Sequence, residues 1–225
     1  MEKIDYKKTE KEFYAPKTEP SVIQVPPMNF IMVDGQGDPN EVGGDYHKAV
    51  ELLYSLSYSI KMGQKKNPSD SLMSTPDYVV PPLEGFWWLE DITDMDFTQK
   101  SKYFWTSMIR QPDFVSPELF EEAKKAVQKK KPELDVSKAR LELFEEGFCV
   151  QCMHLGPYDA EPATLEKMEQ YINLHNLKNN IGSLTSDNKI RRHHEIYLSD
   201  PRKANPATMK TILRHPVTGK DGTCN

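Results

Sequence analysis

The stretch Arg191-Arg192-His193-His194-Glu195-Ile196-Tyr197-Leu198-Ser199-Asp200-Pro201 predicts a buried β-strand. Its apolar and aromatic residues favour extended structure, and Pro201 ends the strand because proline has no N–H to donate. Successive side chains on a strand point to opposite faces. One face of this strand is therefore expected to carry His194, Ile196 and Leu198, and the other His193, Glu195, Tyr197 and Ser199.

Glu195 is the anomaly in this strand. The face shared by His194 and Ile196 suits a hydrophobic core, whereas the opposite face places a carboxylate in the middle of an apolar strand. An unpaired buried carboxylate is costly, so some partner is expected to compensate it. That partner is either a bound ligand or a structural ion pair with Arg110 or Lys210.

Composition narrows the class of protein. The chain has 225 residues, a net charge of −5 and an isoelectric point near 5.7. An acidic chain without a basic face argues against a nucleic-acid partner. No apolar run approaches the length of a membrane span, and residues 1–18 lack the apolar core of a signal peptide. Three cysteines without a secretion signal favour reduced thiols and a cytoplasmic location.

The remaining pattern predicts alternating strands and helices. Residues 1–20 are charged and rich in proline, and are expected to form a flexible arm, although Phe13 and Tyr14 could dock on the fold; a tail is expected at 218–225. Apolar strands are expected at 22–25, 30–33, 86–90, 103–109, 148–155 and 209–215, with a turn at 145–147. Apolar residues at helical spacing predict helices at 46–62, 117–130 and 164–177.

The order strand, helix, strand, strand occurs twice, in pseudo-repeats at about 28–112 and 145–217. The helix near 117–130 joins them within one domain over 21–217. We therefore predict an α+β fold of two tandem modules with pseudo-twofold symmetry, whose antiparallel sheet forms a central ligand groove. The repeat aligns Phe86 with Glu195 and Trp88 with Tyr197.

Two motifs resemble the GyrI-like small-molecule-binding family. They are Gly147-Phe148-Cys149-Val150-Gln151-Cys152-Met153-His154-Leu155-Gly156-Pro157-Tyr158-Asp159 and the strand at 193–201, followed by a matching last strand at 212–217. The resemblance covers about residues 20–217. It implies two strand-helix-strand-strand modules around a concave groove, with Glu195 at the floor among aromatic residues. The chain has no helix-turn-helix module of the kind that regulators in this family carry.

The resemblance also implies a function. Some stand-alone members hydrolyse cyclopropane-bearing, DNA-alkylating natural products as a detoxifying activity. In that case Glu195 orients or deprotonates a water, and Tyr197, Tyr158 or a histidine hydrogen-bonds the developing phenolate. No cofactor is needed for this chemistry. A carboxylate in an aromatic cleft equally suits the binding of a flat hydrophobic ligand without turnover.

The groove walls are expected to be aromatic. In the repeat alignment, Phe86 and Trp88 occupy the same alternating strand positions as Glu195 and Tyr197, so they are expected on the equivalent face. On strand 103–109 either face is compatible with the groove, and the face of Trp105 is favoured. The full set expected to line the ligand is Phe86, Trp88, Trp105, Tyr54, Tyr58, Met153 and His193. For each ring, filling the hydrophobic core is the alternative role. A zinc site is not expected, because the adjacent residues His193 and His194 face opposite ways.

Three functions therefore compete. They are a cofactor-independent hydrolase, a protein that sequesters aromatic drugs, and an inhibitor that binds a protein partner such as DNA gyrase. We expect a monomer or a weak homodimer that binds a hydrophobic aromatic small molecule. A hydrolase requires turnover that is lost on Glu195→Gln, whereas a protein-binding inhibitor tolerates that change.

Overall fold

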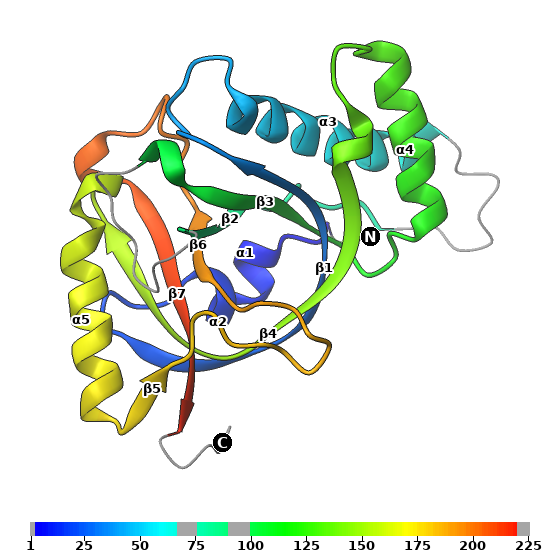
Figure 1. Cartoon of the computed structure of the whole chain (residues 1–225). Helices are drawn as coiled ribbons and strands as arrows, with labels where there is room; N and C mark the ends of the chain where they lie inside the picture. The colour runs from blue at the N-terminus through cyan, green and yellow to red at the C-terminus, as the bar shows by residue number, and fades with distance from the viewer. Residues whose placement is uncertain (1–2, 67–75, 90–99, 220–225) are drawn as a thin grey trace.

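Seven antiparallel strands form the centre of the molecule in the computed structural model, which describes residues 3–66, 76–89 and 100–219. The strands follow one another around the sheet in the order β4-β1-β3-β2-β6-β7-β5, and β4 also pairs with β7. Their bounds are β1 Ser21–Gln36, β2 Leu83–Trp88, β3 Phe104–Gln111, β4 Ala139–Leu155, β5 Leu177–Asn179, β6 His193–Tyr197 and β7 Lys210–Gly219. Because β4 pairs with both β1 and β7, six strands close into a barrel without a free edge (Figure 1).

Five α-helices and four short 3-10 helices accompany the barrel in the described ranges. The α-helices are α1 Tyr6–Thr9, α2 Lys11–Tyr14, α3 Asp45–Lys66, α4 Pro117–Lys130 and α5 Glu161–Leu174. The 3-10 helices are η1 Lys100–Lys102, η2 Val136–Lys138, η3 Tyr158–Ala160 and η4 Pro206–Thr208. The α+β class and the antiparallel sheet are thus confirmed, whereas the pseudo-twofold symmetry stays a prediction. None of the helices in the described ranges has the length and apolarity needed to cross a membrane.

β1 and β4 are longer than the sequence pattern indicates. The Pro26-Pro27 pair was expected to end a strand, and Gly147 was expected to lie in a turn. Instead both strands continue with no shift in register, because Val25 pairs with Gly147 and Pro27 pairs with Glu145. Pro26, between these two pairs, is not itself paired, which suits a residue that has no N–H to donate. Gly147 has a φ of 74°, a conformation that favours glycine.

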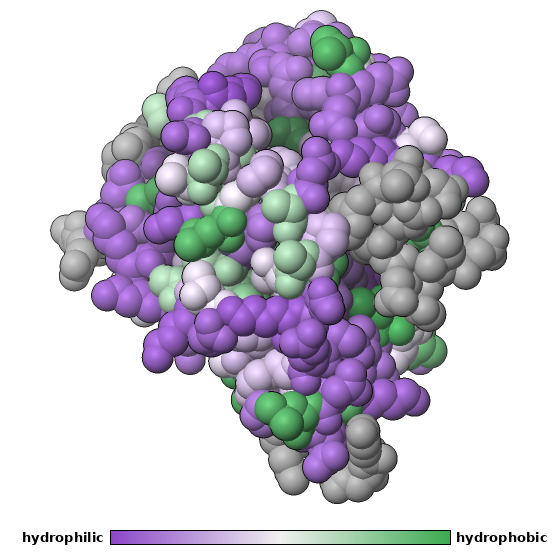
Figure 2. All heavy atoms as spheres, turned by 90° about the vertical axis from the view of Figure 1, so that its left-hand side faces the viewer, coloured by the Kyte–Doolittle hydropathy of each residue, from purple (hydrophilic) through white to green (hydrophobic). Residues whose placement is uncertain are grey.

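The outer surface of the barrel is covered by helices. α3 and α4 pack over β1 and β3, and α5 packs over β4 and β7 (Figure 1). Seen from the side of α5, small apolar patches lie among hydrophilic residues (Figure 2). Exposed single hydrophobic residues, such as Leu155 and Leu174, are ordinary on protein surfaces.

The N-terminal segment fills the inside of the barrel. The sequence suggested a flexible arm for residues 1–20, but α1 and α2 lie against the inner face of the sheet (Figure 1). The side chains of Tyr6, Phe13 and Tyr14 are buried there. The docking of Phe13 and Tyr14, the alternative considered for this segment, is therefore confirmed. We therefore treat this segment as part of the folded core.

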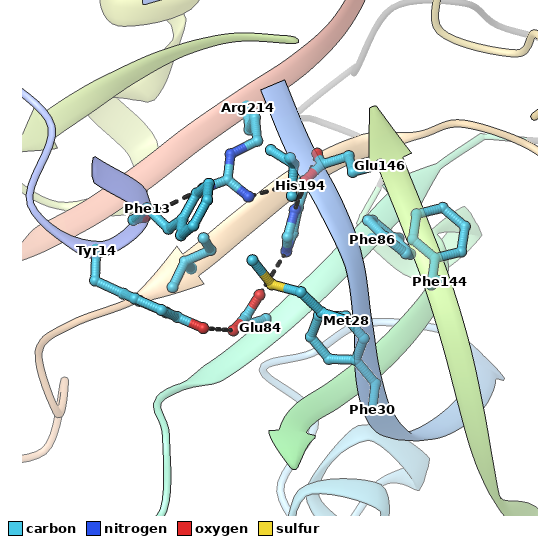
Figure 3. Close-up of a pocket in the computed structure, with 12 residues that line it drawn as sticks. Phe13, Tyr14, Met28, Phe30, Glu84, Phe86, Phe144, Glu146, His194 and Arg214 are labelled. Atoms are coloured by element: carbon cyan, nitrogen blue, oxygen red, sulfur yellow. Dashed lines mark hydrogen bonds and ion pairs between the residues drawn. The ribbon is translucent and has the colours of Figure 1, made fainter. Parts of the chain in front are cut away.

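A network of buried charges fixes the segment to the inner face (Figure 3). His194 contacts Glu84 through Nε2 and Glu146 through Nδ1, each at 3.1 Å. Arg214 Nη1 lies 2.8 Å from a carboxylate oxygen of Glu146, and its Nη2 donates to the carbonyl oxygen of Phe13. These groups line a cavity of about 10 Å³, which has room for about one water molecule. The inner face is therefore packed rather than an open groove.

Candidate functional site

β6 places its two sets of side chains on opposite faces of the sheet, as the alternation predicts. His194 and Ile196 lie inside the barrel, next to Glu84 and Ile212. Glu195 pairs across the sheet with Gly85 on β2 and with Leu213 on β7. Leu213 belongs to the core beneath α5. The face that carries His193, Glu195 and Tyr197 is therefore the outer face, on the side of the helices.

Both carboxylate oxygens of Glu195 accept hydrogen bonds. The Tyr197 hydroxyl donates to Oε2 at 2.7 Å, and Nε2 of His193 lies 3.1 Å from Oε1. Trp87 Nε1 in turn donates to the Tyr197 oxygen at 2.8 Å. Glu195 is 7% exposed, so it is nearly buried without being sealed. Its orientation is fixed from two sides by side chains of β6 itself.

The ion-pair alternative for Glu195 does not hold for Arg110. That guanidinium lies on the inner face, where it forms an ion pair with Glu10 of the N-terminal segment and stacks on the Tyr6 ring. Among the described residues, the ion-pair contact of Glu195 is with His193, and no lysine or arginine lies within 4 Å of its carboxylate. A nearly buried carboxylate that no lysine or arginine contacts remains available for chemistry.

Glu161 supplies a second carboxyl group that sequence reasoning missed. It is the first residue of α5, directly after η3, and is 1% exposed. Its Oε1 has no hydrogen-bond partner among the residues that the structure describes. Burial raises the pKa of Glu161 well above its usual range, and the charge of Glu195 raises it further. The Glu161-Pro162 pair signalled only a helix start, and nothing local in the sequence indicated that its carboxyl group lies near Glu195.

Phenols surround the carboxyl pair. The Tyr158 ring lies 5.8 Å from the Tyr197 ring, and the Tyr46 ring lies 5.4 Å from Trp87. All three tyrosines are partly exposed. Burial and the charge of Glu195 raise the pKa of each phenol, so each keeps its proton at neutral pH. These rings offer apolar faces and hydroxyl groups to a ligand that reaches Glu195.

The open question about strand 103–109 has a clear answer. Trp105 pairs with Trp87 and Ser107 pairs with Gly85, so both lie on the Glu195 face. Trp105 is 1% exposed and packs edge-on against Tyr46, at a ring distance of 5.2 Å. It therefore supports Tyr46 from behind, and Tyr46 is the ring nearer the surface.

Three of the residues expected to line the ligand lie on the other face. Phe86 pairs with His194 rather than with Glu195, and it packs inside the barrel with Met153. Trp88, two residues further along the strand, packs against the same inner cluster and under Arg192. The repeat alignment was wrong by one residue in β2, and a shift of one residue moves every side chain to the opposite face. Trp87 takes the place expected for Phe86 and Trp88.

Tyr54 and Tyr58 lie further from the carboxyl pair. They are four residues apart on α3, and their rings stack at 6.4 Å. Tyr54 is partly buried against the core beneath α3, while Tyr58 is 52% exposed. Among the described residues, the ring contact of each is with the other, so their role at the ligand stays a prediction.

Gly85 leaves space at the centre of the site. It is the direct cross-strand neighbour of Glu195, on the same face as Trp87. A Cβ atom added there would lie 2.9 Å from Trp87 Nε1 and 3.3 Å from the Tyr197 hydroxyl oxygen. The position therefore keeps the hydrogen bond between Trp87 and Tyr197 unobstructed.

We predict that Gly85→Ala disturbs the site. The new methyl group would displace the Trp87 ring, which weakens its bond to Tyr197 and costs about 1–3 kcal/mol of stability as an overpacked side chain. Tryptophan emission, thermal unfolding and ligand affinity would all change. Gly63→Ala is the matched control, because a Cβ at Gly63 on α3 meets nothing within 4 Å. Unchanged tryptophan emission in Gly85→Ala would contradict the prediction.

The described part of the chain contains no group of three or more His, Cys, Asp or Glu side chains arranged to hold a metal ion. His193 and His194 lie on opposite faces of β6 and belong to different clusters. Cys149 and Cys152 are buried free thiols. The polar groups at Glu195 are hydrogen-bonded to one another.

Solved structures provide close relatives. An uncharacterized conserved protein from Listeria innocua is 51% identical, with a TM-score of 0.84, and the match covers 96% of this chain and 100% of that one. A structure described as a hydrolase from Listeria innocua is 50% identical over the same shares, with a TM-score of 0.81. The C-terminal domain of EcmrR shares the fold at 13% identity and a TM-score of 0.51, covering 89% of this chain and 98% of that domain.

A comparison with curated proteins gives no significant match. The model of one family, described as the GyrI-like small molecule binding domain, matches residues 18–217. That range includes β1 to β6 and β7 as far as Val217, together with Glu161, Glu195 and the aromatic residues around them. The chain is a member of the GyrI-like small-molecule-binding domain family.

Proposed function

We propose that this protein binds a flat aromatic electrophile on the outer face of the sheet and hydrolyses it with Glu195 as the base. The observation that carries the proposal is the pairing of two buried carboxyl groups in different environments. Glu195 is held by two donors, whereas Glu161 has an unpartnered oxygen among the described residues and a raised pKa. Two carboxyl groups with environments of this kind divide into a base and an acid.

We infer the substrate class from the rings around the two carboxyl groups. Tyr46, Tyr158 and Tyr197 present partly exposed rings beside the carboxyl pair, which favours a planar, hydrophobic ligand. The family binds small molecules, and relatives of 50% identity are described as hydrolases. We infer that the substrates are cyclopropane-bearing alkylating compounds whose strained ring is conjugated to a dienone.

The reaction adds one water molecule. Glu195 takes a proton from the water, and the water oxygen forms a bond to the CH₂ carbon of the cyclopropane. The strained C–C bond breaks, and its electron pair moves into the dienone to make a phenolate. Protonated Glu161 gives its proton to that oxygen, and Tyr158 donates a hydrogen bond to it. Solvent then returns the proton from Glu195 to Glu161.

Tyr197 has a supporting part in this scheme. Its only proton is donated to Glu195, and its oxygen accepts from Trp87. A hydroxyl that is engaged in this way is poorly placed to protonate a substrate. We therefore assign orientation of the base to Tyr197, and contact with the substrate oxygen to Tyr158.

The test is incubation of the protein with a panel of flat aromatic compounds, half of which carry a fused cyclopropane. Mass spectrometry would detect products heavier by one water, and equilibrium dialysis would measure binding. Hydrolysis restricted to the cyclopropane compounds supports the proposal. Binding of both halves of the panel without any product would support sequestration instead, and the absence of both would refute a small-molecule role at this site.

The raised pKa of Glu161 gives a pH-dependent prediction. If the protonated form is the acid, activity persists at neutral pH and falls as the pH rises through the raised pKa of Glu161. Glu161→Gln should remove that decline and lower turnover by about 10²-fold. Glu166→Gln, at an exposed position of the same helix, is the control. If the activity of Glu161→Gln still falls at high pH as in the wild type, the assignment of Glu161 as the acid is contradicted.

A further inference from the structure

Two buried histidines stand behind Glu195, and the proposed reaction does not use them. His193 is 1% exposed and His215, on β7, is 9% exposed. Nδ1 of His193 lies 2.8 Å from Nε2 of His215, and the two rings are nearly perpendicular at 79°. Nε2 of His193 contacts Glu195, as described above. The three side chains thus form a line from β7 to the carboxylate.

If Glu195 is ionised and His193 is neutral, hydrogen-bond chemistry allows one arrangement of the protons along this line. An ionised Glu195 only accepts, so Nε2 of His193 carries the proton of that contact. A neutral His193 then has an unprotonated Nδ1, which must accept from Nε2–H of His215. Nδ1 of His215 has no hydrogen-bond partner among the described residues. Each donor in the line therefore points toward Glu195.

Electrostatics favour a neutral His215. Burial lowers its pKa well below the usual value, and the neighbouring His193 lowers it further, while the charge of Glu146 from the other face opposes the shift. The groups that face Glu195 itself are His193 and Tyr197 on β6, Tyr46 on α3, Tyr158 on η3 and Glu161 on α5. Lys100 and Asp159 act on Glu161 from the surface. Of these groups, His193 is the one that can change its role: in one neutral tautomer its Nε2 donates to Glu195, and in the other its Nε2 can only accept.

We propose that His215 is a positioning residue, which holds His193 in the tautomer that donates to Glu195 and so makes Glu195 the ionised member of the pair with Glu161. The inference rests on the proposed function, because it explains which of the two carboxyl groups acts as base. Without His215, Nδ1 of His193 would lose its donor, and the opposite tautomer would present an unprotonated nitrogen to Glu195. That arrangement favours a protonated Glu195, which cannot activate water.

The first measurement concerns the wild-type protein and needs no substrate. Two-dimensional ¹⁵N NMR of the imidazole rings reports which nitrogen of each histidine carries the proton. We expect Nε2 of both His193 and His215 to carry a proton and Nδ1 of His193 to carry none. A proton on Nδ1 of His193, or a doubly protonated His193, would overturn the inference.

The second measurement compares His215→Gln with His215→Leu. The glutamine amide can still donate to His193, so His215→Gln should keep the wild-type tautomer and the acidic limb of the pH–rate profile. In His215→Leu we expect mixed tautomers of His193, an acidic limb moved to higher pH, and turnover at acidic pH lowered about tenfold, as for a lost hydrogen bond to a charged group. KM should change little.

The outcomes separate the two proposals. If no compound is hydrolysed, the proposed function fails. The tautomer of His193 in the wild type and in His215→Gln then still tests whether His215 positions His193. If hydrolysis occurs, and His215→Leu is folded and keeps the acidic limb of the wild-type pH–rate profile, the positioning role of His215 is refuted. The proposed function then stands. Thermal unfolding of both variants identifies any loss that comes from the fold alone.

Discussion

Replacement of Glu195 by glutamine is expected to lower turnover by about 10²–10⁴-fold, the usual contribution of a positioned general base. Glutamine has nearly the same size, but its amide cannot take a proton from water. One of its two terminal atoms is also an NH₂ group, which would face either the Tyr197 hydroxyl or Nε2–H of His193. The substitution thus removes the base and one of the two hydrogen bonds that orient it.

Ligand binding should survive Glu195→Gln, because the aromatic surroundings are unchanged. Quenching of Trp87, which lies one hydrogen bond from the site, offers a direct measurement of affinity. Glu145→Gln is the matched control, since Glu145 is exposed on β4, away from the site. Equal turnover in Glu195→Gln and wild type would refute the role of base. A loss of affinity as large as the loss of turnover would make Glu195 a ligand contact only.

The local part of this site was readable from the sequence. Strand alternation alone placed His193, Glu195 and Tyr197 on one face and His194 and Ile196 on the other, because the period of a strand is two residues and needs no long-range information. The mid-strand Glu195 stood out because a carboxylate is unusual among strand formers. The structure confirms the separation of the two faces.

The parts that depend on pairing were not readable. Which of Phe86 and Trp87 shares a face with Glu195 is set by the register between β2 and β6, and these strands are separated by more than a hundred residues. Glu161 reaches the site only through the packing of α5 on the sheet. Gly85 matters because a Cβ there would meet the side chains of Trp87 and Tyr197, which lie on different strands.

The second large prediction concerns the stability that the buried charge network on the inner face provides. Glu146→Gln should lower the free energy of unfolding by about 3–5 kcal/mol, the cost of breaking a buried ion pair from one side. The change leaves Arg214 and a protonated His194 without the carboxylate that both contact. Arg214 also holds the carbonyl oxygen of Phe13, so the N-terminal segment should loosen together with the network. Chemical denaturation measures the loss, and limited proteolysis reports the release of residues 3–17.

Glu145→Gln is again the control, because adjacent residues on β4 face opposite sides and exposed substitutions usually stay within about 0.5 kcal/mol. A loss of similar size in both variants would contradict the role given to the network.

Acid provides an independent test of the same network. Burial alone would raise the pKa of Glu146, but His194 and Arg214 outweigh it and lower that pKa to about 2. A depressed carboxyl pKa contributes stability above its unfolded value of 4.5, and this contribution is lost as the pH falls toward 2. The pKa of His194 is raised, because the two carboxylates outweigh its burial, so its contribution is instead lost as the pH rises through that value. Glu146→Gln should flatten the acid side of the stability curve, whereas an acid slope equal to that of the wild type would show that the carboxylate is not ionised in the fold.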